Sequence, residues 1–198
     1  MVKLYITKTD INSLKEINSL SDYRRKKAER IVHEKDRAQS VTAGLLLEKF
    51  FKGNKIKTGV YGKPYIEGGP EFNLAHSGEY VILAIGDSPV GCDIERMKKI
   101  DYLRVGRVVL TENELTAIEN ADDARSLFYE FWTKKEAFIK LTGEGFHCPL
   151  KNLDFSARQS ELIHDGAPCF FKEYMLEDYK IMLCTREKTD CGLEYVDV

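Results

Sequence analysis

The order of apolar and polar residues predicts a chain in which helices alternate with groups of strands. Val2 to Thr7 alternates apolar side chains with polar or aromatic ones, which is the period-two pattern of a half-buried strand. A helical segment is expected near Asp10 to Leu20, and the basic run Tyr23 to Ile31 leads into a longer helix from about Glu34 to Phe51. The buried face of that longer helix is predicted to consist of Val41, Leu45, Leu46, Leu47 and Phe50.

From Gly59 the pattern changes to short β-prone runs separated by turn residues. Val81 to Ile85 and Val90 to Glu95 are predicted to pair as a hairpin through the turn Gly86-Asp87-Ser88-Pro89. The last part of the chain is β-rich again, and its expected strands are Ala167 to Leu176, Tyr179 to Thr185 and Leu193 to Val196.

Two helices with recognisable ends are predicted between these strand-rich regions. Thr111, followed by Glu114 three residues later, predicts a capping box. The second helix has Asp122 or Asp123 as its N-cap and ends at Gly143. Each half of the chain therefore consists of helices followed by strands, and the change falls near Ile100. This order favours an α+β fold with two similar halves, although no literal sequence repeat relates them.

Composition limits the possible classes of protein. The 198 residues are 43% hydrophobic and 31% charged, and the net charge of -2 argues against a nucleic-acid coat or an anionic membrane as partner. The sequence has no apolar run of signal-peptide or membrane-span length, so a cytosolic location is expected. Five scattered cysteines without a C-x-x-C pair fit reduced thiols, and four dispersed histidines do not suggest zinc, so any metal is expected to have oxygen ligands.

Two carboxylates in the predicted strand Val90 to Glu95 are candidates for such a metal site. Asp93 and Glu95 are two residues apart, so they project from the same face of the strand, about 6.5 Å apart along it. Carboxylates placed in this way raise each other's pKa unless a cation lies between them, and Mg²⁺ is a common solution. An acidic strand end that faces water is the alternative interpretation.

The helix that ends at Gly143 carries a second candidate group. Trp132, Glu136 and Lys140 follow one another at i, i+4 and i+8, so an aromatic ring, a carboxylate and an ammonium share one edge. Taken alone, this pattern more often belongs to a surface Glu-Lys pair that supports the helix. Lys63, on the turn Gly62-Lys63-Pro64, is expected to be free to point at a ligand, whereas His76 either anchors backbone or takes part in chemistry.

Basic residues in the first half complete the pattern. Arg24 and Lys27 belong either to a solvated helix end or to a phosphate site. Carboxylates that hold Mg²⁺, together with cations that hold phosphate oxygens, indicate a phosphoryl-transfer type of site, because charge neutralisation does most of the work in such reactions. The residues alone do not identify the substrate.

Four motifs in this order resemble the Sfp-type 4'-phosphopantetheinyl transferases. They are G-K-P at 62–64, F-N-L-A-H-S at 72–77, G-C-D-I-E at 91–95 and W-T-K-K-E-A-F-I-K-L-T-G-E-G at 132–145. The last two match the signatures G-x-D-x-E and W-x-x-K-E-A/S-x-x-K-x-x-G-x-G. His33, Asp36 and Ser40 resemble a further motif, in which Gln39 replaces the usual arginine, and Ala75 replaces a usual serine.

The resemblance implies transfer of the phosphopantetheine arm of coenzyme A to a serine of an apo acyl or peptidyl carrier protein, as in fatty-acid or secondary-metabolite synthesis, with release of adenosine 3',5'-bisphosphate. It implies two subdomains, 1–100 and 101–198, related by a pseudo-twofold axis, with the active site between them in a monomer. Mg²⁺ would be bound by Asp93, Glu95 and Glu136. Coenzyme A would be bound by Arg24, Lys27, Ser40, Lys63, His76 and Lys140, with Glu136 as the base and Lys135 adding nearby positive charge.

Two other functions use similar residues. A Mg²⁺-dependent phosphodiesterase or nuclease also combines D-x-E with a separate E-x-x-x-K, but the near-neutral charge and the lack of a basic, aromatic-interleaved groove oppose it. A coenzyme A or carrier-protein binding module without catalysis would require the loss of metal ligands, and all three acids are present.

Overall fold

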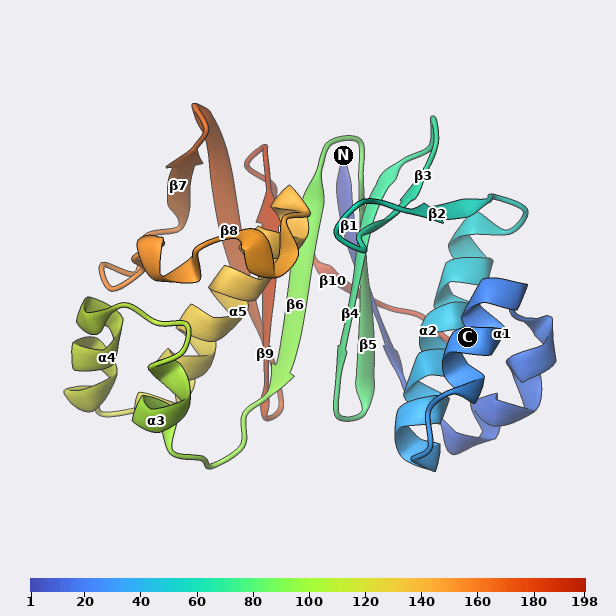
Figure 1. Cartoon of the computed structure of the whole chain (residues 1–198), viewed down its shortest axis with the longest axis horizontal. Coiled ribbons are helices and arrows are strands. Elements are labelled where there is room, and N and C mark those ends of the chain that lie inside the picture. The colour runs from blue at the N-terminus through green and yellow to red at the C-terminus, as the bar shows by residue number, and fades with distance from the viewer.

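The computed structural model describes the backbone of residues 1–198 and every side chain except that of Phe146. Helices and strands alternate as the sequence pattern predicts, which confirms an α+β fold (Figure 1). The strands are β1 (Val2–Lys8), β2 (Ile56–Thr58), β3 (Pro64–Ile66), β4 (Glu71–Ser77), β5 (Tyr80–Gly86), β6 (Val90–Arg96), β7 (Glu161–His164), β8 (Ala167–Leu176), β9 (Tyr179–Thr185) and β10 (Leu193–Tyr195). The α-helices are α1 (Asp22–Glu29), α2 (Glu34–Phe51), α3 (Tyr102–Gly106), α4 (Glu112–Glu119) and α5 (Ala124–Thr142), and the 3-10 helices are η1 (Ile11–Ser19), η2 (Gly145–His147) and η3 (Leu150–Asn152).

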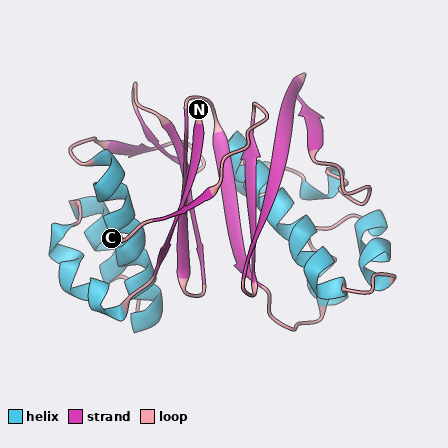
Figure 2. Ribbon diagram, turned by 180° about the vertical axis from the view of Figure 1, so that it is seen from behind, coloured by secondary structure: helices cyan, strands magenta, loops and turns pink.

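Two four-stranded sheets form the centre of the molecule, with helices on the outside of each. The first sheet has the order β10-β1-β5-β4, and the second has the order β6-β9-β8-β7. Helix α2 covers the first sheet and α1 packs against α2, while α3, α4 and α5 lie on the side of the second sheet (Figures 1 and 2). Strands β2 and β3 make a separate two-stranded ribbon. Strands β4 and β6 lie next to each other where the two sheets adjoin, a junction that we call the seam.

The predicted hairpin of Val81 to Ile85 with Val90 to Glu95 is wrong. Strand β5 pairs with β1 and β4 in the first sheet, whereas β6 pairs antiparallel with β9 in the second. The turn at 86–89 thus carries the chain from one sheet to the other. Strand β5 is almost entirely apolar and β6 has a buried apolar half, and short buried runs joined by a turn do not reveal which neighbour each strand pairs with.

The two sheets do not divide at residue 100, where the sequence pattern places a boundary. Strand β6 precedes that residue but belongs to the second sheet, and β10, near the C-terminus, pairs parallel with β1 in the first. The chain thus contributes to each sheet from both of its halves. The division into subdomains 1–100 and 101–198 remains a prediction.

The predicted helix ends are confirmed where a specific capping contact defines them. Thr111 and Glu114 form the capping box of α4, and Asp123 caps α5 by accepting a hydrogen bond from the amide of Ser126. Helix α5 ends at Gly143, whose φ of 76° lies in the left-handed region that favours glycine. The segment after β1 is a 3-10 helix, and β2 and β7 are short strands that the sequence pattern did not predict.

Helix α5 is the element that connects the core to the functional site. Its apolar face, with Phe128, Phe131 and Phe138, is buried in a core shared with β8 and β9. Burial of each aromatic side chain contributes roughly 1.5–3 kcal/mol, so this face fixes the position of the helix firmly. In the part of the chain that the structure describes, none of the helices combines the length and hydropathy needed to span a membrane.

Candidate active site

The site lies where α5 packs against β6, and Gly91 makes that close packing possible. A Cβ atom on Gly91 would lie 2.0 Å from the carbonyl oxygen of Ala137 and 2.4 Å from the amide nitrogen of Leu141. Both separations are too short for any residue with a side chain, so glycine alone permits this approach of strand and helix. The residues that follow Gly91 on β6 are thereby brought close to the last turns of α5.

Asp93 is the most buried acid of the site. Its side chain is 5% exposed, and its Oδ1 accepts a hydrogen bond from the Lys140 ammonium at 2.6 Å. Its Oδ2 is buried and has no hydrogen-bond partner among the described residues. Burial raises the pKa of Asp93, and the nearby Lys140 charge only partly opposes that effect. One carboxylate oxygen of Asp93 is thus left with unused bonding capacity.

Glu95 projects from the same face of β6 as Asp93, as the two-residue spacing predicts, while Ile94 is completely buried between them. The Ser77 hydroxyl of β4 donates a hydrogen bond to Glu95 Oε2 at 2.9 Å. Burial and the neighbouring charge of Asp93 raise the pKa of Glu95 to about 7. The carboxyl therefore titrates close to neutral pH in the metal-free protein.

Glu136 and Lys140 approach this pair of acids from α5, one helical turn apart. Burial, followed by repulsion from Asp93, raises the pKa of Glu136. For Lys140, burial acts to lower the pKa, but the Asp93 carboxylate outweighs it, so the pKa is raised and the ammonium stays charged. The structure thus brings three acids and one lysine into a single electrostatic group, as the sequence predicts.

This group has the properties of a divalent-cation site. All three carboxyl groups have raised pKa values, and repulsion from Asp93 contributes to those of Glu95 and Glu136. A hard divalent cation would relieve both the repulsion and the unpartnered Oδ2 of Asp93. The donor set of three carboxylates therefore fits Mg²⁺.

A second acidic group was missed by the sequence interpretation. Among the described residues, Glu144, His164 and Asp165 have potential ligand atoms that all lie within 4.8 Å of one another. The carboxylate oxygens of the three acids beside Lys140 are not all that close together. Asp165 is exposed and the other two are partly exposed, and exposed acidic groups often gather without a metal. Glu144 follows the C-cap of α5, whereas His164 ends β7 and Asp165 lies in the turn before β8, so no sequence spacing relates them.

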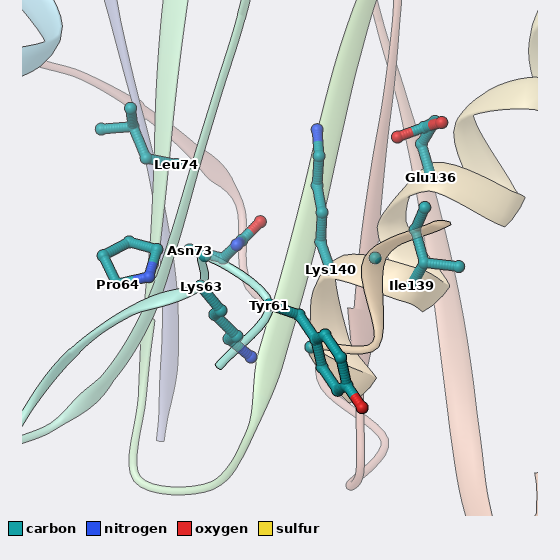
Figure 3. Close-up of a pocket in the computed structure, with 11 residues that line it drawn as sticks. Tyr61, Lys63, Pro64, Asn73, Leu74, Glu136, Ile139 and Lys140 are labelled. Atoms are coloured by element: carbon teal, nitrogen blue, oxygen red, sulfur yellow. The ribbon is translucent and has the colours of Figure 1, made fainter. Parts of the chain in front are cut away.

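A pocket of about 260 Å³ opens beside Glu136 and Lys140 (Figure 3). Figure 3 shows Glu136, Ile139 and Lys140 on α5 facing residues of β4 and of the turn before β3. The pocket is lined by Tyr61, Gly62, Lys63, Pro64, Asn73, Leu74, Glu136, Ile139, Lys140, Gly143 and Gly145. It thus combines charged groups with apolar walls. Its apolar members come from separate elements, and no local sequence signal indicated them.

Lys63 lines this pocket, but its ammonium is not free, contrary to the expectation from its position on a turn. Its Nζ donates hydrogen bonds to the carbonyl oxygens of Val90, at 3.2 Å, and Leu141, at 2.9 Å. Burial lowers the pKa of Lys63. These acceptors lie 27 and 78 residues away in the sequence, so only the folded chain reveals the contacts.

The predicted phosphate-binding residues of the first half lie on α1 and α2. Arg24 is 8% exposed and donates a hydrogen bond to the carbonyl oxygen of Ser40 at 2.8 Å. Arg24 Nε and Ser40 Oγ are both buried and have no partner among the described residues. Burial lowers the pKa of Arg24. Lys27, one turn of α1 from Arg24, is exposed.

His76 lies on β4, where the charges of basic residues from both halves of the molecule act on it. Desolvation by the surrounding chain lowers its pKa, and the charges of Lys140, Lys27 and Arg24 lower it further. Its side chain nevertheless remains exposed to solvent. Cations from both sides of the seam therefore create a positive electrostatic potential at the His76 imidazole. The same potential would attract an anionic ligand.

Lys135 does not add positive charge to this site, and that expectation is wrong. Its side chain is 1% exposed and lies 2.7 Å from Glu114 Oε2. The ammonium also donates hydrogen bonds to the carbonyl oxygens of Val109 and Leu150. Residues 135 and 140 are about 140° apart around a helix, so they face different neighbours.

The two departures from the resembled motifs have simple positions in the structure. Gln39 Nε2 donates a hydrogen bond to the carbonyl oxygen of Gly78 at 3.1 Å and so connects α2 to the end of β4. Ala75 is 4% exposed and packs in the core between the sheets. Neither residue contacts the acids on β6 through a hydrogen bond.

Known proteins similar to this chain share one description. A family profile described as the 4'-phosphopantetheinyl transferase superfamily matches residues 89–192, which include β6 and α5. The chain is 30% identical over 183 residues to the 4'-phosphopantetheinyl transferase Sfp of Bacillus subtilis (strain 168), covering 83% of this chain and 81% of that protein.

Two relatives from other organisms carry the same description. A 4'-phosphopantetheinyl transferase of Bacillus pumilus is 36% identical over 148 residues, covering 69% of this chain and 62% of that protein. One of Aneurinibacillus migulanus is 30% identical over 171 residues, covering 79% and 72% respectively. The similarity therefore includes most of the chain as well as the two motifs at the site.

Proposed function

The chain belongs to the 4'-phosphopantetheinyl transferase superfamily, and from this premise we propose how its residues perform the transfer. As an enzyme of this kind it moves the 4'-phosphopantetheine group of coenzyme A to a carrier protein. In the proposed reaction the acceptor is a serine hydroxyl of an apo acyl or peptidyl carrier protein, and adenosine 3',5'-bisphosphate leaves. The observation that carries the assignment of the site is the group formed by Asp93, Glu95, Glu136 and Lys140 at the seam.

Asp93, Glu95 and Glu136 hold Mg²⁺ in this proposal. Their raised pKa values, which come first from burial, and the unpartnered Asp93 Oδ2 support the assignment. When bound, Mg²⁺ supplies positive charge that stabilises the pyrophosphate and the leaving phosphate. The buried position of Asp93 keeps water away from the carboxylate, which strengthens its interaction with any cation.

Lys140 and His76 bind the pyrophosphate of coenzyme A in this proposal. Lys140 lines the pocket and stays protonated because of Asp93, so its ammonium can donate to a phosphate oxygen on which charge grows. The lowered pKa of His76 makes the imidazole neutral near pH 7, with one N–H donor and one acceptor. This pair thus combines a fixed charge with a directional hydrogen bond.

Arg24, Lys27, Ser40 and Lys63 bind the phosphate at the nucleotide end. The unpartnered Arg24 Nε and Ser40 Oγ support this part of the proposal, because buried polar atoms are rarely left without a partner. Lys63 would have to give up its carbonyl acceptors to reach a phosphate, and it already lies on the wall of the pocket. Lys27 is exposed and needs no such rearrangement.

Glu136 is the proposed general base for the serine proton. Burial and Asp93 raise its pKa, which brings the carboxyl closer to the operating pH and strengthens it as a base. Its position on the pocket wall leaves it accessible to a substrate hydroxyl. We further propose that the enzyme acts as a monomer in the cytosol, where its five free cysteines stay reduced.

The test is the intact mass of apo acyl carrier and apo peptidyl carrier proteins after incubation with the enzyme, coenzyme A and Mg²⁺. A gain of one phosphopantetheinyl group, absent with EDTA, is expected. An unchanged mass for every carrier in a broad panel, with an enzyme that binds coenzyme A, would instead identify a binding module. Transfer that EDTA leaves unaffected would refute the metal assignment alone.

A further inference from the structure

The seam between the sheets is joined by side chains of β4. Strands β4 and β6 are edge strands of their two sheets. The backbone amides of β6 that face β4 therefore form no backbone ladder with it and bond to side chains of β4 instead. Asn73 Oδ1 accepts the amide hydrogen of Cys92 at 2.9 Å, and Ser77 Oγ accepts that of Arg96 at 3.1 Å. Asp93 and Glu95 lie on the strand between these two bridges.

Each bridge makes a further contact. The Cys92 thiol donates to the backbone carbonyl oxygen of Asn73 at 3.4 Å, and the Ser77 hydroxyl donates to Glu95 Oε2 at 2.9 Å. Ser77 therefore holds both the backbone at Arg96 and the carboxylate of Glu95. Asn73 is 4% exposed, so its amide oxygen is committed to this contact in a dry environment, where hydrogen bonds are stronger.

The register explains why these residue types occur at these positions. Asn73 and Ser77 are four residues apart on β4, so their side chains point to the same side, about 13 Å apart along the strand. Cys92 and Arg96 are also four residues apart, so both bridges fit two strands that run side by side in the same direction. An asparagine amide and a serine hydroxyl are short and contain the acceptor that a free N–H requires.

We propose that Asn73 and Ser77 are positioning residues that hold β6 against the first sheet and thereby fix the metal-binding carboxylates, an inference that rests on the proposed function. Ser77 orients Glu95 directly. Asn73 acts one residue before Asp93, through the backbone of Cys92. Without these bridges, β6 would keep its ladder with β9, its packing against α5 and the first sheet, and the Lys63 contact at Val90. The backbone beside the two carboxylates would be less constrained, so they would sample more orientations.

The experiment uses the whole 198-residue chain without coenzyme A and measures Mn²⁺ binding by electron paramagnetic resonance. Ser77→Ala is expected to weaken Mn²⁺ binding about tenfold, as is typical for the loss of a hydrogen bond to a charged group. Ser77→Thr keeps the hydroxyl and is expected to restore binding to within about twofold. Ser88→Ala, on the turn between β5 and β6, is the matched control and is expected to bind Mn²⁺ like the wild type.

Amide hydrogen exchange supplies a readout that does not depend on the metal. The Arg96 amide is expected to exchange at least about tenfold faster in Ser77→Ala, and the Cys92 amide in Asn73→Leu, while amides of β9 keep their protection. If Asn73→Leu does not fold, Asn73→Asp, which keeps an acceptor oxygen, is expected to retain slow exchange at Cys92. Wild-type exchange in Ser77→Ala together with unchanged Mn²⁺ affinity would overturn the inference.

A failure of the underlying metal assignment gives a different result. If Asp93→Asn binds Mn²⁺ as tightly as the wild type, the ligand set is wrong, whatever the seam variants do. If Asp93→Asn loses Mn²⁺ and Ser77→Ala keeps it, the metal site stands and the positioning role of Ser77 is refuted.

Discussion

Helix α5 carries two lysine-carboxylate pairs that are alike in chemistry and distance but differ in their surroundings. Lys135 lies 2.7 Å from Glu114, and Lys140 lies 2.6 Å from Asp93. Glu114 also accepts the amide hydrogens of Thr111 and Phe155, and Lys135 also donates to two carbonyl oxygens. The first pair is therefore completely satisfied within the protein.

The second pair leaves bonding capacity unused. Asp93 Oδ2 has no partner among the described residues, and burial together with the charge of Asp93 raises the pKa values of Glu95 and Glu136 beside it. A buried ion pair with all its partners holds structure, whereas one with a spare oxygen and like charges nearby is prepared for a ligand. The two ion pairs have nearly the same N–O distance. The further hydrogen-bond partners of each pair therefore distinguish the structural pair from the reactive one.

The largest effect is expected at the Lys140–Asp93 pair. Asp93→Asn keeps the size of the side chain but removes its negative charge, so kcat/KM for transfer should fall by at least about 1,000-fold. The fold should not suffer, because the raised pKa of Asp93 shows that its charged form is costly in the protein. Steady-state transfer kinetics and a thermal melt test both parts. Normal turnover would remove Asp93 from the site.

The opposite result is expected at the Lys135–Glu114 pair. Lys135→Met leaves the Glu114 charge buried without its cation, which should cost about 3–5 kcal/mol of unfolding free energy. Urea unfolding measures this cost. Adding Glu114→Gln should recover part of it, because the uncompensated charge is then removed. A single variant as stable as the wild type, with lost transfer activity, would contradict the division between the two pairs.

An intermediate effect is expected for Lys140→Ala. The ammonium is proposed to stabilise phosphate charge that grows during transfer, so kcat should fall about 100-fold and KM for coenzyme A should also rise. Stability should fall as well, because the buried Asp93 carboxylate loses its cation, so a thermal melt accompanies the kinetics. Saturation kinetics in coenzyme A separate the two effects. A change confined to KM would show that Lys140 binds substrate equally in the ground state and the transition state.

The two pairs also show how far sequence could predict this molecule. The strands, caps and signature acids follow local rules of period and spacing, so Asp93, Glu95, Glu136 and Lys140 were identified together. The role of Lys135 was not predicted, because its partners at Glu114 and Leu150 are distant in sequence. The same reason explains the wrong hairpin, since pairing of apolar strands depends on contacts that no local pattern encodes.

The smallest effect expected is a pH dependence of stability that belongs to the reactive region. The pKa of Glu95 is raised from its usual 4.5 to about 7, so between these values the folded protein binds more protons than the unfolded chain. Stability of the metal-free enzyme should therefore fall as pH rises from about 4.5 to about 7, by roughly 1–2 kcal/mol after allowance for solvent screening. Urea unfolding with EDTA at several pH values measures this slope.

Glu95→Gln should flatten that slope because the titrating group is gone, and saturating Mg²⁺ should reduce it because the cation favours the ionised carboxylates. Glu114→Gln should leave the slope in place, since the satisfied pair does not create this repulsion. If Glu95→Gln retained the wild-type slope, the pH response would come from elsewhere in the chain. Titration would then no longer distinguish the two ion pairs. The unpartnered Oδ2 of Asp93 would still distinguish them, because it does not depend on the titration of Glu95.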